Sequence, residues 1–374
     1  MLPDWFDKPL RAPAACRVFV DGHEIDDLYP LLVEAQAILD RQESAEATLL
    51  LEDRRLEDGR WAVHDDPRLH PWAEIRLEAS FGSHQERVFS GFIRQLKVEL
   101  PQDQGGASVT LECQDHALLL DRVQRRKRWG DRTPTSDAAI VRSICDDADL
   151  DTLEPLGQGF TDLVVNQNES DGRFLRKRAE ENGYDLFFRD GALYFGPPRL
   201  DRDAQAPIKV YAGADTHALR FAIDDDGHHP ARVAYEVAGD DDDRTRAQSV
   251  ESDLPILGQT PATPGGPGDF TWHLDREGLS DENQARHRAR ALANQAALRI
   301  EASGELDGAC YGHVLLPGEP VGVDGIGEQY GGRWLVARVE HRFDADGYRQ
   351  AFSLLRNGYG DDLEVRPHPL AALF

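Results

Sequence analysis

Residues 169–198 contain the residue types that acid–base chemistry uses. Glu180 and Glu181 are adjacent carboxylates in a segment that is also rich in basic and aromatic residues. Adjacent side chains on a helix point about 100° apart, so these two carboxylates cannot both face one substrate atom. The solvated face of an amphipathic helix accounts for their charges. We therefore predict that the segment is structural and contains no catalytic pair.

A basic run at residues 122–132, RVQRRKRWGDR, surrounds Trp129. A phosphate-binding arm with a stacking aromatic residue would use these residue types. The alternative is a domain junction whose arginines pair with acids of a neighbouring segment. The chain has 42 basic and 68 acidic residues, and its net charge of −26 favours the junction and repels nucleic acid. We expect no stable nucleic-acid binding.

Residues 224–230, DDDGHHP, could suggest a metal site. Consecutive residues rarely converge on one ion, however, so a solvated turn fits this segment better. His341 falls on the apolar side of a predicted strand, where a hydrogen-bonded core histidine is expected. We predict no catalytic residues, no cofactor-binding residues, no metal ligands and no cofactor. The cysteines are far apart and unpatterned, which indicates buried reduced thiols: Cys16, Cys113, Cys145 and Cys310.

Most of the elements around these residues are predicted to be short strands. In WAEIRLEASFG, period-two alternation places Ile75, Leu77 and Ala79 on one face, which is typical of a half-buried strand. An Asp21-Gly22 pair marks a hairpin near the N-terminus. Similar runs separated by turn residues recur before residue 122 and again after residue 210. They indicate small antiparallel β-barrels or sandwiches.

The region between the strand-rich parts is predicted to be a helix packed on a β-hairpin. Ser170 or Asp171 can cap this helix, and Gly183 can end it in the left-handed conformation. Asp190-Gly191 lies between two apolar runs and supplies the turn of the hairpin. A second helix, capped by Ser136, completes a small α+β unit.

These patterns predict a β-rich α+β fold with two small antiparallel β-barrels, an inserted α+β domain of helices and a hairpin, and one long helix. No apolar run approaches the ~20 residues that cross a bilayer, and the N-terminal sequence is unlike a signal peptide. We therefore expect no membrane partner and synthesis in the cytoplasm. The predicted boundaries are 1–122 (first barrel), 123–205 (inserted domain), 206–250 with 301–360 (second barrel), 251–300 (a loop rich in Pro and Gly, then the long helix at 281–299, capped by Ser280) and 361–374 (C-terminal tail).

Three phrases carry a resemblance to a known family: VFSGFIRQL at 88–96, NESDGRFLRKRAEENGYDLFFRDGALYFGPP at 168–198, and LPGEPVGVDGIGEQYGGRWLVARVEHRF at 316–343. The second phrase is the most specific. With the order of barrel, α+β unit and barrel, the chain resembles the phage late control protein D family over residues 16–357. These are central baseplate hub proteins of contractile tails and related injection machines, akin to the hub portion of type VI VgrG spike proteins.

The resemblance implies a structural protein that is not an enzyme. It implies a homotrimer whose barrels form a pseudo-sixfold ring, which adapts a threefold spike to a sixfold tail tube and continues the central channel. The expected partners are a separate spike protein, the tail tube or tube-initiator protein, and other baseplate proteins. The protein would be assembled in the bacterial cytoplasm and end up in the tail baseplate of a virion or phage-tail-like particle.

Two other functions stay open. A tail-associated cell-wall hydrolase or peptidase would need a convergent carboxylate pair or a metal triad, and the sequence shows neither at a usable spacing. A nucleic-acid-binding tail protein would use Arg125, Arg126 and Arg128, and its affinity would depend on salt.

Overall fold

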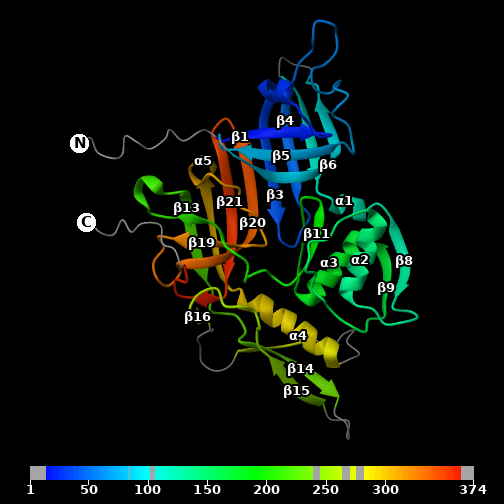
Figure 1. Cartoon of the computed structure of the whole chain (residues 1–374), viewed down its shortest axis with the longest axis vertical. Helices are drawn as coiled ribbons and strands as arrows, with labels where there is room; N and C mark the ends of the chain where they lie inside the picture. The colour runs from blue at the N-terminus through cyan, green and yellow to red at the C-terminus, as the bar shows by residue number, and fades with distance from the viewer. Residues whose placement is uncertain are drawn as a thin grey trace, which may run out of the picture.

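The computed structural model describes residues 14–82, 84–101, 106–238, 245–262, 270–274 and 282–363. Within these ranges the fold is β-rich, its sheets are mostly antiparallel and its helices are few, as predicted. In Figure 1 the N-terminal strands (blue) lie at the top, the C-terminal strands (orange and red) below them, the inserted helices at the right and a long helix (yellow) at the bottom. None of the described helices is long and apolar enough to cross a lipid bilayer.

The N-terminal strands β1 to β7 form what we call the first β-unit. They are ordered β3-β4-β7-β6-β5-β1-β2. Asp21 and Gly22 have φ of 46° and 78°, as the predicted two-residue hairpin turn requires. Ile75, Leu77 and Ala79 are buried, as their alternation predicted. The elements are β1 (Ala15–Val20), β2 (His23–Glu24), the 3-10 helix η2 (Asp26–Leu31), β3 (Leu32–Asp40), β4 (Glu46–Asp53), β5 (Glu74–Ser80), β6 (Gln85–Glu99) and β7 (Ala107–Gln114).

The second β-unit is assembled from strands that are distant in the sequence. Its antiparallel order is β13-β18-β21-β20, while β19 pairs with β20, and β12 lies parallel to β19. Its elements are β12 (Gln205–Lys209), the 3-10 helix η3 (Gly213–Asp215), β13 (Ala218–Asp225), β18 (Ile300–Asp307), α5 (Gly308–Tyr311), β19 (Pro320–Asp324), β20 (Gly332–Asp344) and β21 (Gly347–Arg356).

One long strand, β20, joins the two β-units into a single sheet. While β21 pairs with one edge of β20, the other edge pairs first with β19, at residues 332–335, and then with β3, at residues 338–343. At the change of partner, the Ala337 carbonyl accepts a hydrogen bond of 3.1 Å from the backbone N–H of Arg41. Gln36 also donates to the Glu340 carboxylate over 2.6 Å. We call the β3–β20 pairing the seam, and it determines how the two β-units are oriented relative to each other.

The inserted unit follows the first β-unit and packs around its own apolar core. Its local signals are confirmed: Ser170 caps α3 by accepting from the Arg173 N–H, and Gly183 ends the helix with φ of 67°. Asp190-Gly191 forms the hairpin turn, and Ser136 caps α2. The elements are α1 (Ala117–Leu120), β8 (Gln124–Trp129), α2 (Asp137–Ala148), β9 (Val165–Ser170), α3 (Asp171–Asn182), β10 (Asp185–Arg189) and β11 (Ala192–Gly196).

A separate three-stranded sheet packs on the long helix. Its order is β15-β14-β17. Ala285, Ala289 and Ala293 of the helix contact Val233 and Tyr235 of β14, because small side chains let the helix approach closely. The elements are β14 (Arg232–Ala238), β15 (Thr245–Val250), β17 (Thr271–His273) and α4 (Glu282–Ala297). The short strands β16 (Thr260–Pro261) and β22 (Gly358–Tyr359) pair with each other, antiparallel, outside this sheet.

Two strands of this separate sheet come from the range predicted for the second barrel. Within residues 206–250, β12 and β13 belong to the large sheet, whereas β14 and β15 do not. Alternation within a strand shows which face is buried but not which neighbouring strand it pairs with, so the sequence could not separate these two groups. The domain boundaries themselves stay a prediction. Ser280, Asp281 and residues 364–374 of the predicted tail lie outside the described residues.

Candidate functional site

The predicted acid pair on α3 does not converge on a common target. Glu181 forms an ion pair with Arg178, whereas Glu180 is exposed. Arg178 is buried, and its guanidinium donates to both carboxylate oxygens of Asp137 over 2.6 and 3.0 Å. Asn182 donates to the same carboxylate over 2.8 Å. These contacts connect α3 to α2. The charges of Arg178, Asp137 and Glu181 are thus paired with one another within the fold.

The basic run on β8 pairs with acids, as the junction interpretation predicted, but these acids belong to the inserted unit itself. Arg125 contacts Asp147 at 2.6 Å and Asp171 at 2.8 Å. Trp129 is only 7% exposed, and its indole N–H donates to Gln167 over 2.9 Å. Lys127 lies over the Trp129 ring, 3.4 Å from its centroid. The ring is therefore not available to stack on a nucleic-acid base.

The solvated turn predicted at residues 224–230 is wrong for its first two residues, because Asp224 and Asp225 end β13. The Asp225 carboxylate accepts hydrogen bonds from the hydroxyls of Tyr330 and Tyr359 over 3.0 and 2.9 Å and pairs with Arg299. His341 is fully buried, and its Nδ1 lies 2.8 Å from the Tyr348 hydroxyl. Burial lowers the pKa of His341 to about 3, so the imidazole is neutral. The prediction of a hydrogen-bonded core histidine is confirmed.

Three of the four cysteines lack the environment of reactive thiolates. Cys113 and Cys145 are buried, while Cys16 and Cys310 are half-buried. Burial raises the pKa of Cys16, Cys113 and Cys145 to about 12, so these side chains stay protonated near neutral pH. Thiolate chemistry at these three positions is therefore disfavoured.

The β10–β11 hairpin contacts both β-units and forms a three-way junction. Asp185 pairs with Arg41, the residue after β3, and is fully buried. Burial raises the pKa of Asp185 to about 6, against the opposing effect of Arg41. At the other end of β10, Arg189 pairs with Glu319 and donates to the Pro317 carbonyl over 2.8 Å. These contacts fix the inserted unit against the first and the second β-unit at once.

A cavity of about 310 Å³ lies at this junction. Its apolar lining comes from all three units, and charged side chains also line it. Its volume and mixed lining would accept a small ligand or a side chain of another protein. The lining includes Leu39, Val88, Phe89, Phe187, Phe188 and Leu316.

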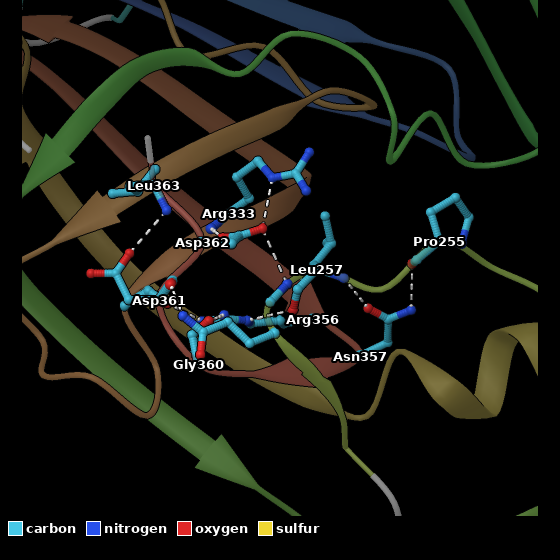
Figure 2. Close-up of polar contacts among 12 residues, drawn as sticks. Pro255, Leu257, Arg333, Arg356, Asn357, Gly360, Asp361, Asp362 and Leu363 are labelled. Carbon is cyan, nitrogen blue, oxygen red and sulfur yellow. Dashed lines mark hydrogen bonds and ion pairs between the residues drawn. The ribbon is translucent and has the colours of Figure 1, made fainter. Parts of the chain in front are cut away.

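Arg356, at the end of β21, is a fully buried cation without a direct carboxylate partner among the described residues. Its guanidinium donates to four backbone carbonyls: those of Leu257, Gly331 and Gly360 over 2.9, 2.7 and 2.6 Å, and that of Tyr330. Burial lowers the pKa of Arg356 to about 10. Figure 2 shows this Arg356 cluster, in which one side chain joins three chain segments.

Neighbouring side chains extend the Arg356 cluster to the last described residues. Asn357 donates to the Pro255 carbonyl over 2.8 Å and accepts from the Leu257 N–H (Figure 2). Asp362 accepts from the backbone N–H and the guanidinium of Arg333, both at 2.8 Å. These contacts determine where the chain leaves the second β-unit.

The large sheet has an open edge at β13, which pairs only with β18 in the part of the chain that the structure describes. Open strand edges carry unpaired backbone groups that can add a strand of another chain. Leu219 is 52% exposed and lies at a register shift in the β13–β18 pairing. Tyr211, in the turn before β13, is 92% exposed and has φ of +52°. A strand of another chain could pair with this edge.

The structure brings together one group that the sequence analysis missed. Ligand atoms of His84, Glu86 and His313 all lie within 4.8 Å of one another. The spacing of His84, just before β6, and Glu86, its second residue, was a weak signal, because alternate residues of an extended chain share a face. Glu86 and His313 are 227 residues apart, so the sequence could not indicate that they meet.

Taken over the whole chain, the fold is that of phage tail proteins and of a protein of the type VI secretion system. The 43 kDa tail protein of prophage MuSo2 from Shewanella oneidensis has 12% identity and a TM-score of 0.67, with 92% of this chain and 98% of that chain covered. A Neisseria meningitidis tail protein has 13% identity and a TM-score of 0.61, with coverage of 92% and 97%. An E. coli component of the type VI secretion system, similar to bacteriophage T4 tail proteins, has 13% identity and a TM-score of 0.55, with coverage of 94% and 80%.

The chain belongs to the Alg8 N-terminal domain family, whose model matches residues 12–345. No curated protein matches it by sequence. At the identities of the solved structures, the likeness concerns the fold, and it supports the tail-protein part of the predicted resemblance.

Proposed function

We propose that the chain is a structural hub subunit of the late control protein D type, at the centre of the baseplate of a contractile tail or a related injection system. The likeness of its fold to tail proteins carries this proposal. It covers 92% of the chain and 97–98% of two tail proteins. A single domain shared by unrelated proteins would not align over the first β-unit, the inserted unit and the second β-unit together.

In this proposal each β-unit is a small tube-forming barrel, and three subunits form a pseudo-sixfold ring. The seam supports the idea, because it holds the two β-units of one chain at a set orientation, as neighbouring positions in a ring require. The junction contacts of Asp185 and Arg189 add rigidity. The open β13 edge supplies backbone groups for contacts between subunits.

The ring would adapt a threefold spike to a sixfold tail tube and continue the central channel. Its partners would be two further copies of this chain, a spike protein, the tail tube or tube-initiator protein, and other baseplate proteins. Assembly would take place in the bacterial cytoplasm, and the product would be the baseplate of a virion or phage-tail-like particle. Three copies of a chain with charge −26 carry −78, which disfavours adhesion of nucleic acid or acidic cargo to the channel wall.

We also propose that the protein acts without catalysis. The polar groups that the sequence singled out serve the fold: Glu181 pairs with Arg178, and His341 is neutral and buried. A cell-wall hydrolase of the tail would need a carboxylate pair on one substrate atom, and Glu180 with Glu181 does not supply it. Purified protein is expected to release no product from peptidoglycan, and turnover would contradict this part of the proposal.

Native mass spectrometry of the chain, co-expressed with a candidate spike protein, tests the hub proposal directly. We expect a trimer of about 125 kDa before the spike is counted, from three chains of 41.8 kDa. A chain that stays monomeric in the presence of the spike would overturn the proposal.

Replacing Leu219 with glutamate is expected to shift trimers to monomers. The side chain is 52% exposed, so the subunit itself should stay folded, while the added charge lies at the β13 edge of an already acidic protein. Val123→Glu is the matched control, because Val123 is 60% exposed on the inserted unit, away from this edge. Size-exclusion chromatography with light scattering measures the shift. Equal trimer content in both variants would remove the β13 edge from the interface.

A further inference from the structure

We propose that His84, Glu86 and His313 form a binding site for a divalent transition-metal ion, with Zn²⁺ as the preferred ion, and that this ion joins the first β-unit to the second. His84 immediately precedes β6, and Glu86 is its second residue. His313 lies in the connection between α5 and β19. The site therefore connects two segments that belong to different β-units. The prediction of no metal ligands was made from spacing alone, which cannot detect such a site.

The three potential ligand atoms are close to the separation that a tetrahedral ion requires. His313 Nδ1 lies 2.7 Å and His84 Nε2 lies 3.5 Å from the same oxygen of Glu86. Bonds of about 2.0–2.1 Å at tetrahedral angles place ligand atoms roughly 3.4 Å apart. All three atoms already lie within 4.8 Å of one another, so side-chain rotations of a small size complete the arrangement.

The surroundings hold each ligand in place. The His84 ring stacks on Phe81, with centroids 5.0 Å apart, and the His313 ring meets the edge of Tyr311 at 5.9 Å. The second oxygen of Glu86 accepts from the Val314 N–H over 2.6 Å. Such supporting contacts orient metal ligands in known sites. They leave the first oxygen of Glu86 directed at both imidazoles.

Two contacts must change when an ion binds. His313 Nδ1 donates to the Glu86 carboxylate over 2.7 Å, so binding of a metal at this nitrogen moves its proton to Nε2 and replaces the hydrogen bond. His84 Nε2 lies 3.0 Å from the Gly312 carbonyl and, as a neutral N–H, donates to it. Binding of a metal at Nε2 moves the proton to Nδ1 and replaces this hydrogen bond. The free energy lost with these hydrogen bonds is small compared with that of the metal–imidazole bonds. The side chains of His84 and His313 are half-exposed, which gives the ion a path to the site.

The donor set selects the class of ion. Two imidazole nitrogens and one carboxylate oxygen suit Zn²⁺ and neighbouring transition metals, whereas Ca²⁺ and Mg²⁺ prefer oxygen ligands alone. Three protein ligands leave a fourth position for water. An ion that binds the folded chain but not the unfolded chain stabilises the fold, and the gain grows with the logarithm of the free ion concentration relative to its Kd. The expected role is a cross-link between the β-units.

The test uses the full chain without an affinity tag, stripped of metal by a chelator and titrated with Co²⁺. We expect one Co²⁺ per chain with the intense visible absorption of a tetrahedral site, displacement by Zn²⁺, and a higher Tm in Zn²⁺. His84→Gln and His313→Gln should each weaken Co²⁺ binding at least about tenfold, since even supporting residues cost roughly 10–100-fold. His70→Gln is the control, because His70 is exposed and lies 4.0 Å from Asp21.

Three results would overturn the proposal. One is Co²⁺ absorption that is weak and typical of octahedral, oxygen-rich coordination. Another is absorption that stays unchanged in both His84→Gln and His313→Gln. The third is a Tm that Zn²⁺ does not raise although it binds, which would show that the ion does not favour the folded state. Circular dichroism of each variant without metal confirms that a lost signal reflects a lost ligand.

Discussion

Replacing Arg356 with methionine is expected to lower the free energy of unfolding by about 3–5 kcal/mol, a large part of the ~5–15 kcal/mol that stabilises a typical protein. Methionine is flexible and fills much of the same space, but it donates no hydrogen bond. The carbonyls of Leu257, Gly331 and Gly360 would then be buried without this donor, and an unsatisfied buried acceptor costs about 1–3 kcal/mol. The segment before β16 and the C-terminal segment would both loosen.

Urea unfolding followed by tryptophan fluorescence measures this loss, because the Arg356 guanidinium lies 5.5 Å from the centre of the buried Trp334 ring. Arg333→Met is the matched control. Arg333 belongs to the same cluster, but its side chain is 33% exposed, so its pair with Asp362 is worth about 1 kcal/mol or less. Arg356→Lys keeps the charge without the planar fork and should resemble Arg356→Met. Equal unfolding midpoints for Arg356→Met and Arg333→Met would contradict the assigned role.

Acidification from pH 7 to pH 5 is expected to remove about 2 kcal/mol of stability through His341 alone. Burial lowers the pKa of His341 to about 3 in the folded protein, while an unfolded chain has a histidine pKa near ~6.5. Between these values the unfolded state binds more protons. Stability is therefore fully present above about pH 6.5 and falls as the pH is lowered towards 3, by about 1.4 kcal/mol per pH unit.

Two buried acids act in the opposite direction, so the effect of His341 must be measured as a difference. Burial raises the pKa of Asp115 and of Asp185 to about 6. Their protonation below that pH favours the folded state, because the folded state then binds more protons. The stability of the native protein minus that of His341→Gln should fall by about 2 kcal/mol between pH 7 and pH 5. A difference that stays constant between pH 7 and pH 5 would refute the prediction.

The junction hairpin explains why the inserted unit interrupts two β-units without making the molecule loose. Arg41 contacts it from the end of β3, and Glu319 contacts it from just before β19. An insertion held on one side only would move as a flexible appendage. Because the inserted unit contacts both β-units, it helps to fix their relative orientation, as the proposed ring requires.

The sequence predicted helix caps and hairpin turns correctly, because each depends on residues within or beside a single element. Ser170 caps α3 with its own hydroxyl, and Gly183 ends that helix because glycine adopts positive φ at low cost. Asp190-Gly191 turns the hairpin for the same reason. His341 was correctly placed in the core from strand alternation, since alternate residues of a strand share a face.

Other features depend on contacts between distant residues, and the sequence analysis could not reach them. The arginines of β8 were expected to pair with acids, but which acids, Asp147 and Asp171, depended on how α2 and α3 pack. Arg356 gave no signal at all, because its partners are backbone carbonyls, which every residue carries. The His84, Glu86 and His313 group was missed since its members come from different β-units.

The sequence by itself determined the β-rich α+β class, the helix caps, the hairpin turns and the apolar faces of the strands, because each follows from the residues within one element. Only the tertiary structure decided which strands are neighbours. The pairing of β20 first with β19 and then with β3 depends on a change of partner near Ala337, and β14 and β15 join a sheet of their own. Hydrogen bonds between strands use backbone groups that are alike in all residues, so the choice of partner comes from the packing of the whole fold.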